Sequence, residues 1–323
     1  MLINKMLYVI KNDLNALEKG LSCQVYSDAA LITEIGRHLV KAGGKRLRPA
    51  LYFLAAHSRS QYDINYVLPL AITIELIHMA SLVHDDVLDN ASTRRGAITA
   101  NAKWGNNISI LSGDFLFARA FGLIANKDYD KRVLLRLADV ICGLSEGEIH
   151  QNEKHYKLRS EEEYYEAISK KTADFIAASC EIGGVVAGLS KDDTDKLHTY
   201  GLCLGMAFQI TDDILDLTSS DKKIGKPAGN DILQGIITLP VIRAVHTGPD
   251  REELVSIITD KELDAEMVKR AVEITKNSSG LDYAREKVYD YLDRARQALP
   301  DGLPPSIKKS FIDVADFVGK RDF

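Results

Sequence analysis

The chain has 323 residues, of which 46% are hydrophobic, 27% are charged and 7% are aromatic, and its formal net charge is -5. This balance is typical of a folded globular protein and excludes collagen-like, low-complexity and wholly disordered chains. A slightly acidic chain without a long Lys/Arg stripe also makes nucleic acid a poor candidate partner. Because no linker rich in Pro, Gly or Ser interrupts the sequence, we expect one domain over residues 1–323.

The cysteine spacing and the N-terminal segment indicate in which cellular compartment the protein is expected. The four cysteines form no C-x-x-C pair, so neither a zinc ribbon nor a disulfide scaffold is indicated, and a reducing compartment fits best. They are Cys23, Cys142, Cys180 and Cys203. Residues 1–13 contain no unbroken apolar segment of the kind found in signal peptides, and no later stretch approaches about 20 apolar residues. We therefore expect a cytoplasmic protein without a transmembrane span.

The distribution of proline favours long helices. Proline removes a helical hydrogen bond and costs about 3 kcal/mol inside a helix, and none of the eight prolines lies between Leu70 and Lys226. Asn-Gly or Asp-Gly turns between alternating apolar runs, which indicate hairpins, are not found. We expect an all-α fold, a single-domain bundle of long helices around a central apolar cavity.

Apolar residues that recur three and four positions apart predict the individual helices. In chain order these helices cover residues 3–19, 29–41, 66–89, 108–125, 132–153, 161–187, 194–217, 232–245, 265–276, 282–298 and 306–318. Those at 66–89 and 194–217 are apolar on nearly every side, which is typical of helices in the middle of a bundle.

An acidic motif, Asp85-Asp86-Val87-Leu88-Asp89, closes the first of these two apolar helices. At about 3.6 residues per turn, Asp85 and Asp89 stack on one helix face with Asp86 beside them. Three like charges repel one another, and acidic side chains at a helix C-terminus oppose the helix dipole. A purely structural role therefore does not explain the three aspartates well, and we expect a bound cation to compensate their charge.

The same spacing returns in Asp212, Asp213 and Asp216, at the end of the second apolar helix. One such motif could equally be a solvated helix end. The acidic run at residues 192–195, for example, follows a short loop between two lysines and fits an N-cap with a charged first turn. The recurrence at the ends of two apolar helices is what indicates a site, in which the two motifs face one another across a cavity.

Carboxylate clusters without nitrogen or sulfur donors suit hard cations, and Mg²⁺ is favoured where water and substrate phosphates complete its shell. Zinc would require Cys or His ligands, and an EF-hand would require a spacing that neither motif has. We predict Mg²⁺ bound by the aspartates, with a ligand that carries several phosphate oxygens. The predicted metal ligands are Asp85, Asp86, Asp89, Asp212, Asp213 and Asp216.

Basic residues gather in the loops beside these motifs. Residues 43–49, GGKRLRP, place three cations where glycines allow close backbone approach, and residues 93–96, TRRG, add two more after the first acidic motif. Lys170, Lys171 and Lys226 follow later in the chain. Each alone would be ordinary surface charge. Together with two Mg²⁺ motifs they indicate two diphosphate sites.

These motifs resemble those of the trans-isoprenyl diphosphate synthases from Leu39 to the end of the chain. The resemblance rests on GGKRLRP at 43–49, ELIHMASLVHDDVLDNASTRRG at 75–96, GDFLFARAF at 113–121, GEIHQ at 147–151, KKTA at 170–173, FQITDDILD at 208–216 and GKPAGNDILQG at 225–235. It implies the isoprenoid synthase fold and a prenyltransferase that condenses isopentenyl diphosphate onto an allylic diphosphate.

The resemblance also implies a role for each matching residue. Catalysis would rest on Asp85, Asp89, Lys171, Gln209, Asp212 and Lys226, with Asp86, Asp213 and Asp216 supporting the metal. The allylic diphosphate would be bound by Arg94, Lys171, Thr172, Gln209 and Lys226, and isopentenyl diphosphate by Lys45, Arg48, His78 and Arg95. The allylic C–O bond ionises, the isopentenyl double bond attacks the cation and a proton is lost, while apolar helices exclude water.

Product length is a question of packing on the first apolar helix. Ser81 lies one turn before Asp85 with Ala80 beside it. In the family a bulky aromatic residue at either position stops elongation early, so two small residues imply an open tunnel. They could also merely allow close helix packing. We predict a product of hexaprenyl to octaprenyl size, for quinone side chains such as that of menaquinone, with Ile77 and Ile74 as candidates for the floor.

Several alternatives remain at this point. A class I terpene cyclase shares the fold and one aspartate motif, but it has a different second motif and needs no second diphosphate cluster. A non-catalytic subunit would lack the aspartates. A catalytic subunit of a heterodimeric heptaprenyl synthase, or a shorter-chain farnesyl or geranylgeranyl synthase, fits the motifs as well. We expect a homodimer, with a heterodimer left open.

Overall fold

The computed structural model describes residues 7–59, 62–218 and 228–320. They are almost entirely helical, which confirms the all-α prediction. Two short strands, β1 (Thr93–Arg94) and β2 (Ala97–Ile98), form an antiparallel pair with Thr93 opposite Ile98. The chain divides into two compact units, one over residues 1–138, 179–197 and 300–311, the other over 139–178, 198–299 and 312–323.

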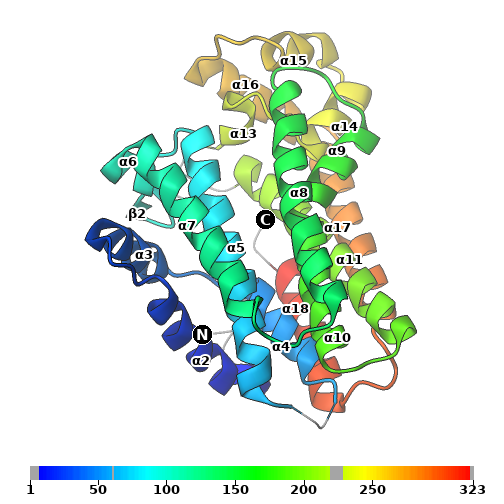
Figure 1. Cartoon of the computed structure of the whole chain (residues 1–323). Helices are drawn as coiled ribbons and strands as arrows, with labels where there is room; N and C mark the ends of the chain where they lie inside the picture. Colours follow the sequence, from blue (N-terminus) through cyan, green and yellow to red (C-terminus); the bar gives the residue numbers. More distant parts are fainter. Residues whose placement is uncertain (1–6, 60–61, 219–227, 321–323) are drawn as a thin grey trace. The chain divides into compact units, whose positions relative to one another are not determined.

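The first unit is arranged around α5 (Ile64–Leu88), which packs along α7 (Asn106–Ile124) (Figure 1). The Asp63 side chain accepts a hydrogen bond from the Asn65 backbone and caps the start of α5. The other elements of this part of the chain are η1 (Tyr8–Ile10), α2 (Lys11–Gln24), α3 (Ala30–Ala42), α4 (Leu47–Ala56), α6 (Ala100–Trp104) and the start of α8 (Lys131–Glu153). The α5 side chains are buried on all sides from Leu70 to Ile77.

The second unit contains the rest of α8, followed by α9 (Glu161–Ile168), η2 (Ser169–Ala173), the start of α10 (Asp174–Val186) and most of α11 (Lys191–Thr218). Its later helices are α13 (Asn230–Leu233), α14 (Leu239–Thr247), α15 (Arg251–Ile258), α16 (Ala265–Lys276), α17 (Gly280–Gln297) and the second half of α18 (Pro305–Gly319). Glycine lets α11 approach its neighbour closely, because a Cβ on Gly205 would lie 2.5 Å from the Ala173 Cα. This contact fixes the C-terminal half of α11 against η2.

The predicted ranges did not contain α6 and α15, and three further differences have physical causes. The predicted helix 161–187 is interrupted by η2, which is a π-helix. The predicted helix 232–245 is two helices, because Gly235 has a left-handed φ of 73° between them. Helix α4 was missed, since Pro49 reads as a breaker although it lies in the first turn, where no backbone N–H is needed.

Two helices bear on the expectation that no stretch of the chain is apolar enough to span a membrane. By length and composition alone, α5 and α7 could cross a membrane, with mean hydropathies of 1.8 and 1.3. In α5, 67% of the apolar window is buried, as in a core helix of a folded unit. In α7 only 33% is buried, so this helix keeps an accessible apolar face.

Candidate active site

The first aspartate motif lies at the C-terminal end of α5, which stops where Asn90 takes a left-handed φ of 49°. Its three carboxylates have different surroundings. Asp86 is only 4% exposed and accepts a hydrogen bond of 2.6 Å from the Arg94 Nε. Asp85 is half-buried and Asp89 is exposed. The middle aspartate is therefore neutralised by the hairpin, while the outer two stay accessible.

The β1–β2 hairpin places Arg95 against the basic loop at residues 43–48. Its two turn residues, Arg95 and Gly96, both have positive φ, of 54° and 77°, as a tight two-residue hairpin turn requires. The Arg95 guanidinium donates to the Gly43 carbonyl. A Cβ on Gly44 would meet that guanidinium, so a glycine here lets the Arg95 side chain lie directly against the loop.

Arg48 on α4 and His78 on α5 meet beside the same loop. The Arg48 Nη1 lies 3.4 Å from the His78 Nε2. Because a guanidinium only donates, Nε2 must accept and the imidazole proton sits on Nδ1. Burial and the neighbouring arginines hold the pKa of His78 well below its usual value, so the ring is neutral. The structure thus brings Arg48, His78 and Arg95 together around the loop, where Lys45 is exposed.

The second aspartate motif, near the end of α11, repeats this division. Asp213 is 4% exposed and accepts hydrogen bonds from the Tyr164 hydroxyl at 2.6 Å and the Gln209 Nε2 at 2.9 Å. The Gln209 Oε1 accepts in turn from the Thr172 hydroxyl at 2.8 Å. Burial raises the pKa of Asp213 to about 6, against the effect of its two donors. The predicted site residues Thr172, Gln209 and Asp213 therefore form one buried network.

The outer residues of this motif, Asp212 and Asp216, are half-buried. The Asp216 carboxylate accepts from the Asp231 backbone N–H at 3.1 Å, and its carbonyl accepts from the Gly229 N–H. These contacts tie the end of α11 to the first turn of α13. As in the first motif, the middle carboxylate is deeply buried, whereas the outer two are more accessible.

Lys171 lies in the π-helix η2, a helix type that is frequent at functional sites. Its Nζ pairs with the Glu148 Oε2 on α8 at 2.6 Å. Gly147 permits this close approach, since a Cβ there would be 3.2 Å from the Lys171 backbone nitrogen. Lys226, also expected at this site, lies outside the described residues.

The donor chemistry fits a hard divalent cation that is completed by substrate. Within the described residues, no group of three or more His, Cys, Asp or Glu side chains is gathered closely enough to hold a metal by itself. The accessible donors at the two motifs are carboxylate oxygens, and two of the six carboxylates are engaged by Arg94, Tyr164 and Gln209. Mg²⁺ suits such incomplete oxygen sets, because it retains waters and takes phosphate oxygens as ligands.

Sequence reasoning gave no role to several residues at these sites. Tyr164 and Glu148 are far from the aspartates in the chain, and only the fold brings them near. Glu75 had a signal, as the one acidic residue within the apolar run before the first motif. Arg46 lies inside the basic motif but is buried, unlike Lys45.

The fold and the two motifs define a class of all-helical enzymes that act on isoprenyl diphosphates, and the comparisons agree. A polyprenyl synthetase family model matches residues 29–275. The chain is 39% identical to heptaprenyl diphosphate synthase component 2 of Geobacillus stearothermophilus, over 100% of both chains, and 32% identical to octaprenyl diphosphate synthase of Escherichia coli, over 99% of both.

Solved structures show the same similarity. A Caulobacter crescentus polyprenyl synthase, complexed with calcium and isoprenyl diphosphate, superposes with a TM-score of 0.92 at 35% identity and 99% and 98% coverage of this chain and that chain. Heptaprenyl diphosphate synthase from Staphylococcus aureus gives a TM-score of 0.90 at 30% identity, with 97% and 99% coverage.

The chain belongs to the polyprenyl synthetase family. It is a trans-polyprenyl diphosphate synthase, a prenyltransferase of isoprenoid biosynthesis. This confirms the resemblance and removes the terpene cyclase alternative.

Proposed function

We propose that this enzyme is a long-chain synthase that adds isopentenyl diphosphate repeatedly to an allylic primer, to a product of hexaprenyl to octaprenyl size for quinone side chains. The observation that carries the proposal is the pair of small residues, Ala80 and Ser81, one turn before the accessible Asp85. Relatives named as heptaprenyl, octaprenyl and nonaprenyl synthases support it. A short-chain synthase of similar identity keeps product length open to experiment.

The outer aspartates, Asp85, Asp89, Asp212 and Asp216, would hold Mg²⁺ on the allylic diphosphate. The middle ones, Asp86 and Asp213, would fix the two helix ends through their buried hydrogen bonds. Bound Mg²⁺ would neutralise charge on the departing diphosphate. The calcium in the Caulobacter crescentus complex supports a divalent cation at such a site.

The protein's own residues supply the rest of the reaction. Arg94, Lys171 and Lys226 add positive charge where the allylic C–O bond breaks, and the Thr172–Gln209 hydrogen bond keeps both side chains in place beside Asp213. Isopentenyl diphosphate is bound by Lys45, Arg48, His78 and Arg95, with the neutral His78 ring donating from Nδ1. Its double bond attacks the allylic cation, a C–C bond forms, and the proton lost from the isopentenyl unit is accepted by an oxygen of the departed diphosphate.

We expect substitutions at the two diphosphate sites to affect different substrates. Lys45→Ala or Arg48→Ala should raise the KM for isopentenyl diphosphate by about tenfold and leave the allylic KM nearly unchanged, because each removes binding of one substrate only. Lys226→Ala should do the reverse. Steady-state kinetics with each substrate varied in turn measures both values. An allylic KM that rises alone in the Lys45 variant would reverse the assignment.

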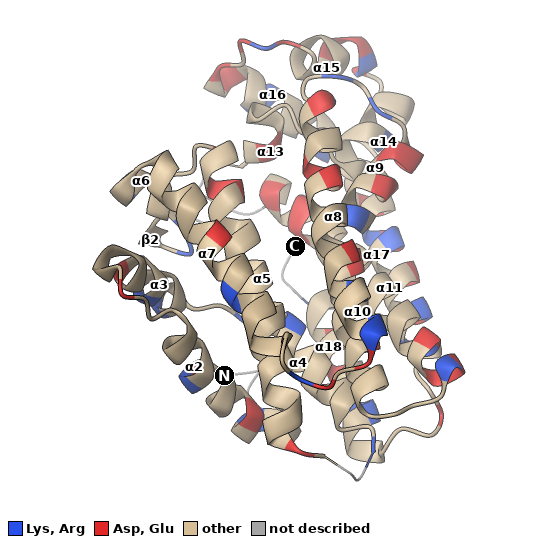
Figure 2. Ribbon diagram, viewed as in Figure 1, with Lys and Arg blue, Asp and Glu red and all other residues tan. Residues whose placement is uncertain are grey.

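The accessible face of α7 supports a dimer. Leu111 and Ile110 are 61% and 42% exposed, and Asp114 and Arg119 are the helix's charged residues, so most of α7 is uncharged (Figure 2). An exposed apolar patch of this kind is typical of a protein interface. We propose that this face binds a second copy of the chain in the cytoplasm.

Sedimentation should give a dimer that Leu111→Glu converts to a monomer. Recovery of the wild-type chain with membranes would contradict this.

Product chromatography of the chain expressed alone tests the function. With farnesyl and isopentenyl diphosphates and Mg²⁺, we expect a single long all-trans product. No product from the isolated chain, with activity restored by a second subunit, would indicate a heterodimer instead. The name of the relative called component 2 makes that the main alternative. A product of farnesyl or geranylgeranyl size would overturn the chain-length proposal.

A further inference from the structure

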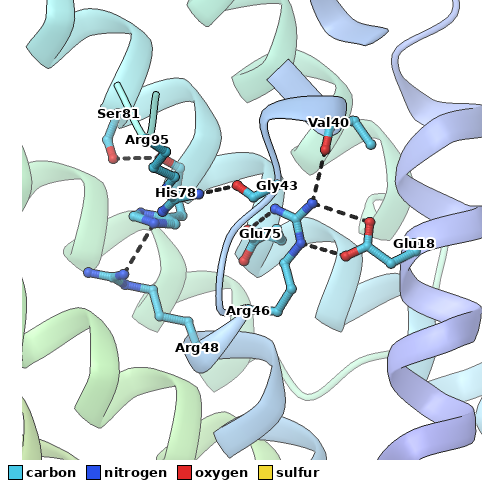
Figure 3. Close-up of polar contacts among 9 residues, drawn as sticks. All are labelled: Glu18, Val40, Gly43, Arg46, Arg48, Glu75, His78, Ser81 and Arg95. Carbon is cyan, nitrogen blue, oxygen red and sulfur yellow. Dashed lines mark hydrogen bonds and ion pairs between the residues drawn. The ribbon is translucent and has the colours of Figure 1, made fainter. Parts of the chain in front are cut away.

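Arg46 differs from the other cations of the basic loop because it is directed into the protein. Its side chain is 7% exposed, and its backbone has a left-handed φ of 50°, which is uncommon for a residue with a side chain. It donates to both Glu18 carboxylate oxygens, from Nε at 2.6 Å and from Nη2 at 3.2 Å, and from Nη1 to the Glu75 Oε1 at 2.7 Å (Figure 3). Nη2 also points toward the Val40 carbonyl at 3.4 Å. A side chain with these partners does not reach substrate.

The two acidic partners of Arg46 are not equivalent. The Glu18 side chain on α2 is 47% exposed, whereas that of Glu75 on α5 is 3% exposed. Burial raises the pKa of Glu75, and Arg46, Arg48 and Arg95 act against this rise. A buried carboxylate needs such cations nearby, and a buried guanidinium needs its carboxylate. Glu75 is therefore the partner that compensates Arg46 inside the protein, whereas Glu18 binds it from the accessible side.

The position of this pair connects the two elements that carry the isopentenyl site. Arg46 immediately follows Lys45 and lies two residues before Arg48, and Glu75 lies three residues before His78 on the same helix. Figure 3 shows Arg46 directed to Glu75 and Glu18, while Arg48 is directed to His78. The other end of the loop is bound through the hydrogen bond from Arg95 to the Gly43 carbonyl.

We propose that Arg46 and Glu75 are a positioning pair that holds the loop at residues 43–48 in the geometry in which Lys45 and Arg48 bind isopentenyl diphosphate. The pair supplies the contacts that keep Arg46 in a left-handed backbone conformation, which costs free energy unless its surroundings enforce it. This inference rests on the proposed assignment of Lys45 and Arg48 to that substrate. Neither Arg46 nor Glu75 touches substrate itself.

Glu75→Gln and Arg46→Met test the pair, each keeping most of the side-chain volume. We expect either change to raise the KM for isopentenyl diphosphate by about tenfold, with the allylic KM within about twofold of wild type. The double variant should be no worse than the stronger single variant, because residues that act through one contact are not additive. Glu18→Gln, at the exposed partner, should have a smaller effect.

Thr73→Val provides the matched control on the same helix. Thr73 is fully buried, and its hydroxyl donates to the Ala120 carbonyl at 3.0 Å, away from the basic loop. This variant should lower Tm, as the pair variants do, but leave both KM values within about twofold of wild type. If Glu75→Gln does not fold, Arg46→Lys gives a milder test, because it retains the positive charge. We expect it to raise the KM for isopentenyl diphosphate by about threefold, against about tenfold for Arg46→Met.

Two outcomes would overturn the inference, and a third belongs to the assignment beneath it. The pair would be merely structural if its variants lowered Tm and left the isopentenyl KM unchanged, or raised both KM values equally, while Lys45→Ala raised the isopentenyl KM alone. If Lys45→Ala itself left the isopentenyl KM unchanged, the proposed substrate site would be wrong. The Lys45 variant therefore separates the two failures.

Discussion

Asp85→Ala and Asp212→Ala are each expected to lower the condensation rate by about a thousandfold or more without loss of folding. Each change removes a proposed ligand of Mg²⁺. The positive charge of Mg²⁺ would act mainly on the departing diphosphate. Each also removes a like charge from its motif. The charge of Asp212, for example, contributes to the raised pKa of Asp213. Tm should therefore stay level or rise slightly.

The middle aspartates provide the contrast that makes this result specific. Asp86→Ala and Asp213→Ala should lower the free energy of unfolding by about 1–3 kcal/mol, because Arg94 in one case, and Tyr164 and Gln209 in the other, lose their buried acceptor. Asp192→Ala is the neutral control, since its carboxylate is exposed and pairs with Lys196 on the first turns of α11. It should change neither rate nor Tm.

Activity assays and thermal melting curves measure the condensation rate and Tm of all five variants. A turnover rate equal to that of the wild type in either Asp85→Ala or Asp212→Ala would end the metal-site assignment. A loss of activity that occurs only together with a large fall in Tm would assign those residues to folding instead.

The parts of the site that could be predicted from the sequence are those with a local signal. Asp85 and Asp89 share a helix face by spacing alone, and α5 and α11 were found because their apolar residues repeat along the chain. The glycines and cations of the basic motif are contiguous in sequence, so that loop could also be placed. Residues that are close in the chain share one local backbone geometry, and the spacing of residue types in the sequence therefore predicts how they are arranged.

The contacts that position these residues are not local, and no sequence pattern reports them. Arg46 and Glu75 are 29 residues apart, and Tyr164 and Asp213 are 49 apart. The π-helix around Lys171 lies against Gly205 of α11, and hydrophobic periodicity reports neither the π-helix nor this contact. Two expectations stay predictions: that the two aspartate motifs face one another, and that the chain forms one domain.

Ser81→Phe is expected to shorten the main product from the long-chain range to the farnesyl or geranylgeranyl class. Ser81 is half-buried, and its hydroxyl donates to the His78 carbonyl of its own helix at 2.9 Å. A phenyl ring at this half-buried position should therefore displace less packed structure than one at a fully buried position. Ala80 is fully buried, so Ala80→Phe should have the same effect on length but also cost about 1–3 kcal/mol through overpacking.

Ser81 is thus the cleaner probe of the two, and Ser81→Ala is its control, since it loses the hydroxyl but adds no bulk. The first condensations should proceed normally in all three variants, because the aspartates and both diphosphate sites are unchanged. Chromatography of the products, with the total isopentenyl incorporation measured in parallel, separates a shorter product from a slower enzyme. If both phenylalanine variants retain activity and the wild-type product distribution, the growing chain does not run along this face of α5, and its length must be set elsewhere.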